Sequence, residues 1–353
     1  MNGINVSILR AITTRQKRLT IRNKQLRHLT NSVGFLDWLV VLDLRSNNLS
    51  TLPILLPRNL EVINLGNNVF TDIPEAVYEL TLLKSISIYN NRLQSIPSLL
   101  FEKLVHLEYM NFNHNAIEML CDSISNLVSL KYLSMSHNAL KALPDSIVSN
   151  ADSHLEYLNL GYNQILILPF NIHRLQRMKT LILHKNFLSR LPETFGLLES
   201  LEILDLAGNN LQLLPSSFVQ LKLKECYIEA NPFTRNDLFT SIYREDPMTL
   251  KEIALRKLSS LRIIRIGESN PWLESIIGVK TWRSAGFCAL CKQPFITFWL
   301  EGVHFVNLIE LMKCKNLLLL GKKGSEILYP LRNVFCSYQC LKATDNCYGL
   351  AIA

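Results

Sequence analysis

Residues 155–169 read L-E-Y-L-N-L-G-Y-N-Q-I-L-I-L-P, and this arrangement of leucines around one asparagine recurs along most of the chain. The shared pattern is L-x-x-L-x-L-x-x-N-x-L, usually followed by an aliphatic residue and a proline. Its asparagines lie 21 to 25 residues apart, at Asn47, Asn68, Asn91, Asn115, Asn138, Asn163, Asn186, Asn209 and Asn231. The aliphatic–proline pair follows in seven copies, at Pro53, Pro74, Pro97, Pro144, Pro169, Pro192 and Pro215. Such a period predicts stacked units that bury their apolar residues against their neighbours.

The pattern resembles the leucine-rich repeat. Its L-x-L segment is expected to form a short strand with the leucines pointing inward, because side chains alternate between the two faces of a strand. The asparagine can hydrogen-bond backbone groups where the chain turns, and the proline begins the return segment. A tenth, degenerate copy comes first, with Leu19, Ile21 and Leu26 in register and Lys24 in the asparagine position.

The predicted fold class is therefore α/β. We expect a leucine-rich repeat solenoid of about ten repeats over residues 16–235, with a parallel sheet on its concave face. At ~4.8 Å per strand the sheet would be about 45 Å long. Cys121 takes a proline position and Cys226 a leucine position, so both are expected to be buried structural thiols.

The register also indicates which side chains point outward from the strands. Tyrosine takes the same outward position in three consecutive repeats, with other aromatic and basic side chains beside it. We expect these residues to bind a partner: Tyr89, Tyr109, His114, Tyr132, His137, Tyr157, Tyr162, His184 and Lys185. Rigid aromatic side chains give a large contact area at a small entropy cost. The alternative is that the stacked tyrosines only stabilise one another along the sheet.

The composition is that of a folded chain without export or membrane signals. The chain has 353 residues and is 48% hydrophobic, enough for a sizeable core. Residues 1–10 lack the apolar segment of a secretory signal, and the apolar runs are far shorter than the ~20 residues of a membrane span. We expect an intracellular protein in the cytoplasm, the nucleus or both, with no membrane partner.

The net charge of +8 is concentrated near the start of the chain, where residues 10–27 carry seven basic side chains. Residues 1–15 are predicted to form a basic N-terminal arm. A basic run of this kind is usually a solvated surface, and an acidic protein surface or nucleic acid is the other interpretation. Because no nucleic-acid recognition module accompanies the run, a nucleic-acid partner is not expected.

Residues 236–283 change period and predict a helical cap or linker. Asp246-Pro247, or Thr249 with Glu252 as a capping box, marks a helix start. An apolar stripe follows at helical spacing, at Leu250, Ile253, Ala254, Leu258 and Leu261. The stripe fits a helix that covers the last coil, and it also fits docking into a partner's groove.

Residues 284–353 carry two close cysteine pairs, Cys288 with Cys291 and Cys336 with Cys340. Two thiolate pairs separated by a longer stretch are the ligand arrangement of a closed, structural tetrahedral zinc site. We therefore predict a small zinc-binding domain with these four ligands, and free thiols are the alternative. Such a site has no open position for water and would not catalyse.

The order of these parts resembles a small intracellular family that includes leucine-rich repeat-containing proteins 58 and 28 and leucine-rich repeat protein 1. The matching residues are Asn231-Pro232-Phe233, Asp246-Pro247, Thr249-Leu250, Cys288, Cys291 and Phe335-Cys336-Ser337 through Cys340. The resemblance implies a substrate receptor of a cullin-2 ubiquitin ligase. It implies that Thr249, Leu250, Ala254 and Leu258 contact the Elongin B/C adaptor while a protein substrate occupies the concave face.

The sequence lacks the motifs of an enzyme. No phosphate-binding glycine loop, nucleophile elbow or clustered carboxylate pair is present, so the chain is expected to be a non-enzymatic protein, at most a non-catalytic subunit of a ligase. The paired histidines His114 and His137 lack the further ligands that a metal site needs. The remaining alternatives are the ligase receptor and a leucine-rich repeat signalling or assembly scaffold with no ligase role.

Overall fold

The computed structural model describes residues 11–149, 153–233, 286–288, 294–295, 300–307, 316–318 and 328–335. These residues belong to two compact units. The first contains residues 1–169, 174–187 and 200–208, and the second contains residues 170–173, 188–199 and 209–353. The first unit holds the whole predicted aromatic surface.

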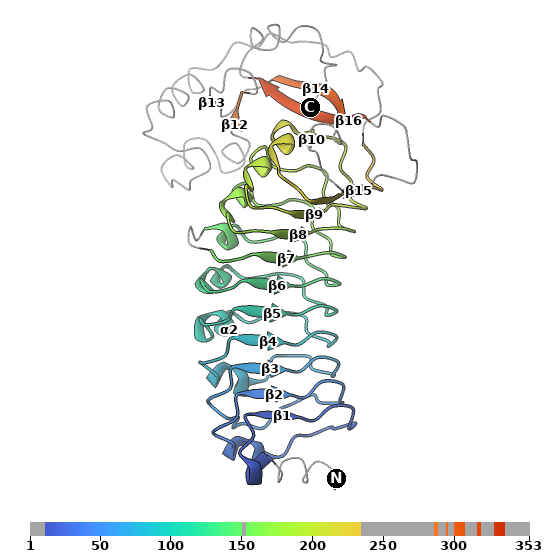
Figure 1. Cartoon of the computed structure of the whole chain (residues 1–353). Coiled ribbons are helices and arrows are strands. Elements are labelled where there is room, and N and C mark those ends of the chain that lie inside the picture. The colour runs from blue at the N-terminus through green and yellow to red at the C-terminus, as the bar shows by residue number, and fades with distance from the viewer. Residues whose placement is uncertain are drawn as a thin grey trace. The chain divides into compact units, whose positions relative to one another are not determined.

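The first unit is a parallel sheet of three-residue strands that pair in chain order, seen as the stacked arrows from blue to green in Figure 1. We number the coils by their strands, so that coil 1 contains β1 and coil 9 contains β9. The strands are β1 (Arg18–Thr20), β2 (Val41–Asp43), β3 (Val62–Asn64), β4 (Ser85–Ser87), β5 (Tyr109–Asn111), β6 (Tyr132–Ser134), β7 (Tyr157–Asn159), β8 (Thr180–Ile182) and β9 (Ile203–Asp205).

Short helical turns follow the strands on the return side of the coils. They are η1 (Asn31–Phe35), η2 (Glu75–Glu79), α2 (Ser98–Lys103), η3 (Asp122–Asn126), η4 (Asp145–Val148), η5 (Ile172–Arg174), η6 (Phe195–Leu197) and η7 (Ser216–Gln220). Pro74, Pro97 and Pro144 each stand directly before a turn in extended conformation, as the fixed φ of proline favours. Cys121 takes the same place before η3 and is half-buried, whereas it was expected to be buried.

The leucines of the repeat fill the interior between the strands and the return segments. In coil 7, Leu158, Leu160 and Ile165 are fully buried. Strand pairing sets Leu19 opposite Leu42, so the degenerate first copy has the register expected from the sequence. The predicted solenoid with a parallel sheet is confirmed.

The repeat asparagine closes each coil against the one before it. In coil 7 the Asn163 side chain donates hydrogen bonds to the carbonyls of Met135 and Leu160, both at 2.9 Å, and accepts one from the Leu140 N–H at 3.0 Å. Asn163 is only 5% exposed, so these bonds replace water for three buried backbone groups. Asn47, Asn68 and Asn186 make the same bonds in their coils.

Within the second unit, strands of residues 300–335 pair with short strands of residues 214–227. Leu214–Pro215 (β10) pairs in parallel with Leu328–Phe335 (β16), which pairs antiparallel with Leu300–Asn307 (β14). Glu225–Tyr227 (β11) pairs in parallel with Asn316–Leu318 (β15), and Gly286–Phe287 (β12) pairs with Pro294–Phe295 (β13). The Arg332 guanidinium binds the Glu193 carboxylate at 2.6 Å, and the Tyr329 ring meets Phe233 edge to face at 5.4 Å.

Asn163→Ala tests the role of the asparagine. The substitution leaves the buried Leu140 N–H without a partner, and it removes one of the two side-chain donors of the Met135 and Leu160 carbonyls, which keep their bonds from Asn138 and Asn186. An unsatisfied buried group costs about 1–3 kcal/mol, and each other lost hydrogen bond costs about 0.5–1.5 kcal/mol. We expect the free energy of unfolding to fall by about 2–4 kcal/mol, measured as a lower urea midpoint by circular dichroism. The neighbouring exposed Gln164→Ala is the control and should leave the midpoint within error. Equal midpoints for both variants would contradict the structural role of Asn163.

Candidate protein-binding surface on the strands

The outward side chains of the strands and of the turn after them form what we call the strand face. Within each coil we number the residues of the pattern from its first leucine, so that the asparagine is at position 9. Strand pairing aligns position 3 of successive coils: Tyr109 lies opposite Tyr132, and Tyr132 lies opposite Tyr157. The predicted tyrosine column is therefore brought together as expected.

The three tyrosine rings stack face to face. Their centroids are 4.3 Å apart between Tyr109 and Tyr132 and 4.2 Å apart between Tyr132 and Tyr157, with interplanar angles of 11° and 6°. All three are half-buried, so their edges remain accessible. Both faces of the Tyr132 ring are covered by its neighbours. Burial first, and then the neighbouring tyrosines, raise the pKa of Tyr132 well above its ordinary value.

A second column follows position 8 in the turn after each strand. His114 stacks on His137 at 4.0 Å, and His137 stacks on Tyr162 at 4.1 Å. Tyr162 is 45% exposed, and both histidines are exposed. Burial and the nearby His114 and His184 lower the pKa of His137, so it is neutral at pH 7.

Position 8 has a left-handed backbone throughout the array. Asn23, Asn67 and Asn90 have φ values of 53°, 53° and 51°, and asparagine is among the residues that tolerate this conformation. His114, His137, Tyr162 and Lys185 have φ values of 54°, 55°, 54° and 53°, although their side chains are larger. The turn therefore holds bulky side chains outward in a conformation that is costly for them.

Tyr89 and His184 belong to position 7, a separate column from the histidines with which the sequence grouped them. Each ring lies across a glycine of the preceding coil. A Cβ at Gly66 would collide with the Tyr89 ring, and one at Gly161 would lie 2.7 Å from the His184 Nε2. His184 is also held by the next coil, because its Nδ1 lies 2.8 Å from the Asp205 carboxylate. Gly66 and Gly161 were the sequence signal for these positions.

Position 2 carries alternating glutamate and lysine beside the tyrosine column. Lys131 binds Glu108 at 2.6 Å, Lys179 binds Glu156 at 2.7 Å and Lys84 binds Glu61 at 3.0 Å. These contacts lower the pKa of Glu108 and Glu156. Exposed pairs of this kind contribute little to stability because solvent screens them, but they leave the flank of the column without net charge. The sequence shows this alternation directly, at Glu61, Lys84, Glu108, Lys131, Glu156 and Lys179, and it is a signal for the flank of the column.

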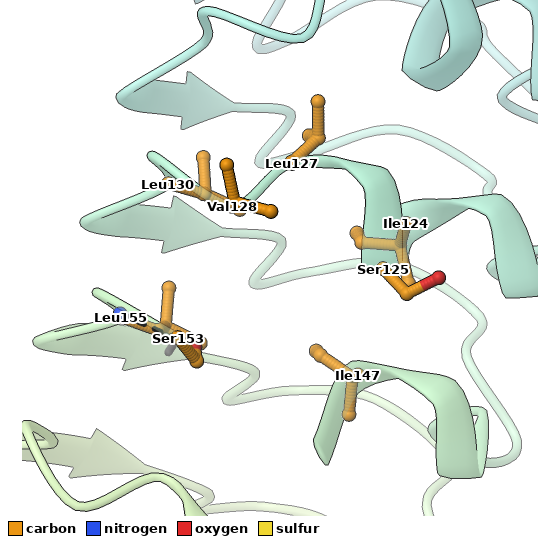
Figure 2. Close-up of a pocket in the computed structure, with 8 residues that line it drawn as sticks. All are labelled: Ile124, Ser125, Leu127, Val128, Leu130, Ile147, Ser153 and Leu155. Carbon is orange, nitrogen blue, oxygen red and sulfur yellow. Dashed lines mark hydrogen bonds between the residues drawn. The ribbon is translucent and has the colours of Figure 1, made fainter. Parts of the chain in front are cut away.

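A small pocket on the return side of the coils has little room for a ligand. The pocket in Figure 2, between η3 and η4 and lined by Ile124, Leu130 and Leu155 among others, has a volume of about 20 Å³, which is room for about one water molecule. Among the described residues no three His, Cys, Asp or Glu side chains cluster as metal ligands, and no helix is long and apolar enough to cross a membrane.

Two groups of predicted site residues fall mostly outside the described part of the chain. Thr249, Leu250, Ala254 and Leu258 lie there, as do Cys291, Cys336 and Cys340. Cys288 is described and is buried beside β12. The zinc site and the adaptor helix therefore stay predictions from the sequence.

Comparison with known proteins supports the repeat architecture. Residues 81–140, 151–165 and 200–221 match models of the leucine rich repeat. These coils are leucine-rich repeats. Leucine-rich repeat proteins are generally non-enzymatic modules that bind other proteins.

The curated relatives include leucine-rich repeat-containing protein 69 from mouse and human. The mouse protein is 35% identical over 147 residues, which cover 40% of this chain and 39% of that protein. The human protein is 36% identical over 137 residues, which cover 37% of this chain and 36% of that protein. The leucine-rich repeat chain thus aligns with less than half the length of these relatives.

Three solved structures share the repeat fold. The ectodomain of the Arabidopsis thaliana receptor kinase GASSHO1/SCHENGEN3, in complex with CASPARIAN STRIP INTEGRITY FACTOR 2, has a TM-score of 0.54 and 27% identity over 61% of this chain and 27% of its own. The Drosophila Toll–Spätzle complex has a TM-score of 0.53 and 22% identity, and the match covers 62% of this chain and 36% of that chain. InlJ of Listeria monocytogenes has a TM-score of 0.53 and 22% identity, and the match covers 63% of this chain and 46% of that chain.

The tyrosine stack predicts a pH dependence of stability. Because the folded-state pKa of Tyr132 is raised above the ordinary value of 10.0, its contribution to stability is complete below pH ~10 and is lost as pH rises toward the folded-state value. We expect the urea midpoint to fall from pH 10 to pH 12. Tyr132→Phe, which keeps the ring and cannot ionise, should fall less steeply. Identical slopes for the two proteins would contradict the raised pKa of Tyr132.

Proposed function

We propose that the strand face of coils 4–8 binds a segment of a partner protein. The observation that carries this proposal is the run of stacked aromatic rings on exposed, rigid positions of consecutive coils. Tyr109, Tyr132 and Tyr157 present ring edges and hydroxyls, and His137 and Tyr162 continue the surface beside them. Side chains already ordered by stacking lose little entropy on binding, which favours affinity.

The composition around the rings also suits a protein partner. Asn111, Asn159 and Ser134 lie between the two columns, and each Glu/Lys pair beside them is neutralised within the chain. Aromatic anchors surrounded by short polar side chains are typical of protein interfaces. Two of the solved relatives, the Arabidopsis ectodomain and Toll, are in complex with a second protein, which supports the same role here.

The double variant Tyr132→Ala/Tyr157→Ala tests this surface. Removing two aromatic anchors should reduce recovery of bound proteins at least tenfold, because anchors of this type contribute about 2 kcal/mol or more each. The measurement is quantitative mass spectrometry of proteins recovered on the purified full-length chain. Phe35→Ala is the matched control, since Phe35 is an exposed aromatic residue on the return turn η1.

The control and the wild type should recover the same proteins in the same amounts. Unchanged recovery by the double variant, with a normal unfolding midpoint, would show that the tyrosines only pack against one another. A lowered midpoint is resolved by Tyr132→Phe/Tyr157→Phe, which keeps the stack and should keep most of the recovery.

A more specific role is that of a substrate receptor of a cullin-2 ubiquitin ligase in the cytoplasm or nucleus. The support is the T-L-x-x-x-A-x-x-x-L pattern of Thr249, Leu250, Ala254 and Leu258, which resembles an Elongin-binding helix. In this proposal the helix binds Elongin B/C, the cullin joins through the adaptor, and the strand face holds the substrate. A signalling or assembly scaffold without an adaptor would use the same strand face.

Leu250→Arg tests the receptor role. An arginine in the apolar stripe should prevent the helix from entering an apolar groove, and Elongin C should be lost from the purified complex. Ser259→Arg is the matched control, because helical spacing sets it opposite the stripe. Immunoblotting for Elongin C measures both. Absence of Elongin C from the wild-type complex, or equal amounts with Leu250→Arg, would favour the scaffold.

A further inference from the structure

Coils 1 and 2 carry most of the net charge of the molecule. Residues 11–58 contain eight Lys and Arg against two Asp and Glu, a net +6 out of +8 for the whole chain. The basic side chains are Arg15, Lys17, Arg18, Arg22, Lys24, Arg27, Arg45 and Arg58. Those of residues 15–27 are all exposed.

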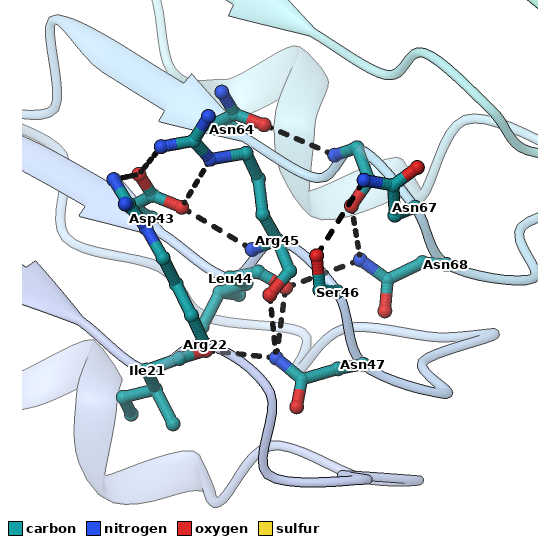
Figure 3. A network of polar contacts seen from close by, with 11 residues as sticks. Ile21, Arg22, Asp43, Leu44, Arg45, Ser46, Asn47, Asn64, Asn67 and Asn68 are labelled. Carbon is teal, nitrogen blue, oxygen red and sulfur yellow. Dashed lines mark hydrogen bonds and ion pairs between the residues drawn. The ribbon is translucent and has the colours of Figure 1, made fainter.

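The main acidic partner on this end of the strand face is already bound by two arginines. Figure 3 shows that Arg22 and Arg45 both pair with the carboxylate of Asp43. The Asp43 side chain is only 10% exposed. Burial alone would raise the pKa of Asp43, but the bonds from Arg22 and Arg45 lower it, so the carboxylate is fully charged. Two guanidinium groups on one carboxylate leave a net positive charge at this place.

The basic end and the aromatic surface share the same columns. At position 3, strand pairing sets Arg18 beside Val41, and the column continues through Val62 and Ser85 to Tyr109. At position 7, Asp43 and then Tyr89 raise the pKa of Arg45, and the Tyr89 ring lies across Gly66. One ligand lying along the sheet would therefore touch both surfaces.

We propose that the partner segment is an extended peptide with acidic side chains over coils 1 and 2 and apolar or aromatic side chains over coils 5–7. The inference rests on the proposed function and adds the chemistry and direction of the ligand. The span from β1 to β7 is six strand spacings, roughly 29 Å at ~4.8 Å each. An extended chain covers this distance in about nine residues at ~3.3 Å per residue.

The ring geometry favours a peptide over single-stranded nucleic acid. Bases bind aromatic side chains by stacking on a ring face. In the two columns, Tyr132 and His137 each have both ring faces covered by neighbouring rings at 4.0–4.3 Å. What they present is ring edges and polar atoms, which suit the side chains and carbonyl groups of a peptide.

A randomised 12-residue peptide library, displayed on phage and panned on the full-length chain, tests this inference. Peptides selected by the wild type should carry Asp or Glu about five to nine residues from an aromatic or aliphatic residue. Panning on Arg18→Glu/Lys24→Glu should remove the acidic preference and keep the apolar one. Arg58→Glu/Lys103→Glu is the charge-matched control, with both changes away from the strand face, and it should select the wild-type sequences.

One selected peptide, synthesised with a fluorescent label, gives the affinity. Arg18→Glu/Lys24→Glu should bind it about tenfold more weakly than the control variant, and the difference should shrink at high salt. The inference is overturned if the selected peptides show no acidic preference, or if Arg18→Glu/Lys24→Glu leaves that preference unchanged. In either case the proposed function still stands if Tyr132→Ala/Tyr157→Ala abolishes peptide binding.

Two other outcomes also decide the question. If no selected peptide depends on Tyr132 and Tyr157, the proposed function fails and this inference fails with it. If a labelled 12-nucleotide oligothymidine binds as tightly as the acidic peptide and loses affinity with Arg18→Glu/Lys24→Glu, the basic coils bind nucleic acid and the inference is overturned.

Discussion

In every regular coil the carboxamide of one asparagine ties three backbone groups together across two coils, as Asn163 does with Met135, Leu160 and Leu140. This bond fixes where the strand ends relative to the preceding strand. A slip of one residue would turn the buried leucines outward and the tyrosines inward. The columns of the strand face exist because the asparagine holds the register of the strands. A binding surface built on these columns is therefore rigid.

The sequence was sufficient for the sheet and for the tyrosine column, because leucine and asparagine mark every coil with little variation. It did not separate positions 7 and 8, where the side chains take different paths. Tyr89 and His184 cross glycines of the preceding coils, whereas His114 and His137 stand on a left-handed turn. Residue spacing gives the position of a Cα atom, but the direction of a long side chain depends on the size of the neighbouring residue.

The second unit shows where periodicity stops being informative. Arg332 binds Glu193 across 139 residues of chain, and β16 pairs with the two-residue strand Leu214–Pro215. No repeat pattern marks residues 328–335, so the sequence predicted a small separate domain in this region and no pairing with residues 214–215. Long-range pairing of an irregular strand depends on packing, and that information is not contained in a local pattern.

The left-handed turn also bears on whether the aromatic rings only stabilise the array. Tyr132 stands in an extended strand, where tyrosine is favourable and stacking alone would account for it. At position 8 the chain uses asparagine in coils 1, 3 and 4 but histidine or tyrosine in coils 5–7. A left-handed backbone costs tyrosine about 1–2 kcal/mol, which stacking at about 0.5–1.5 kcal/mol only offsets, whereas histidine adopts this conformation more readily. Tyrosine at position 8 therefore adds little net stability to the array. Recognition of a partner explains the exposed ring of Tyr162 better than packing does.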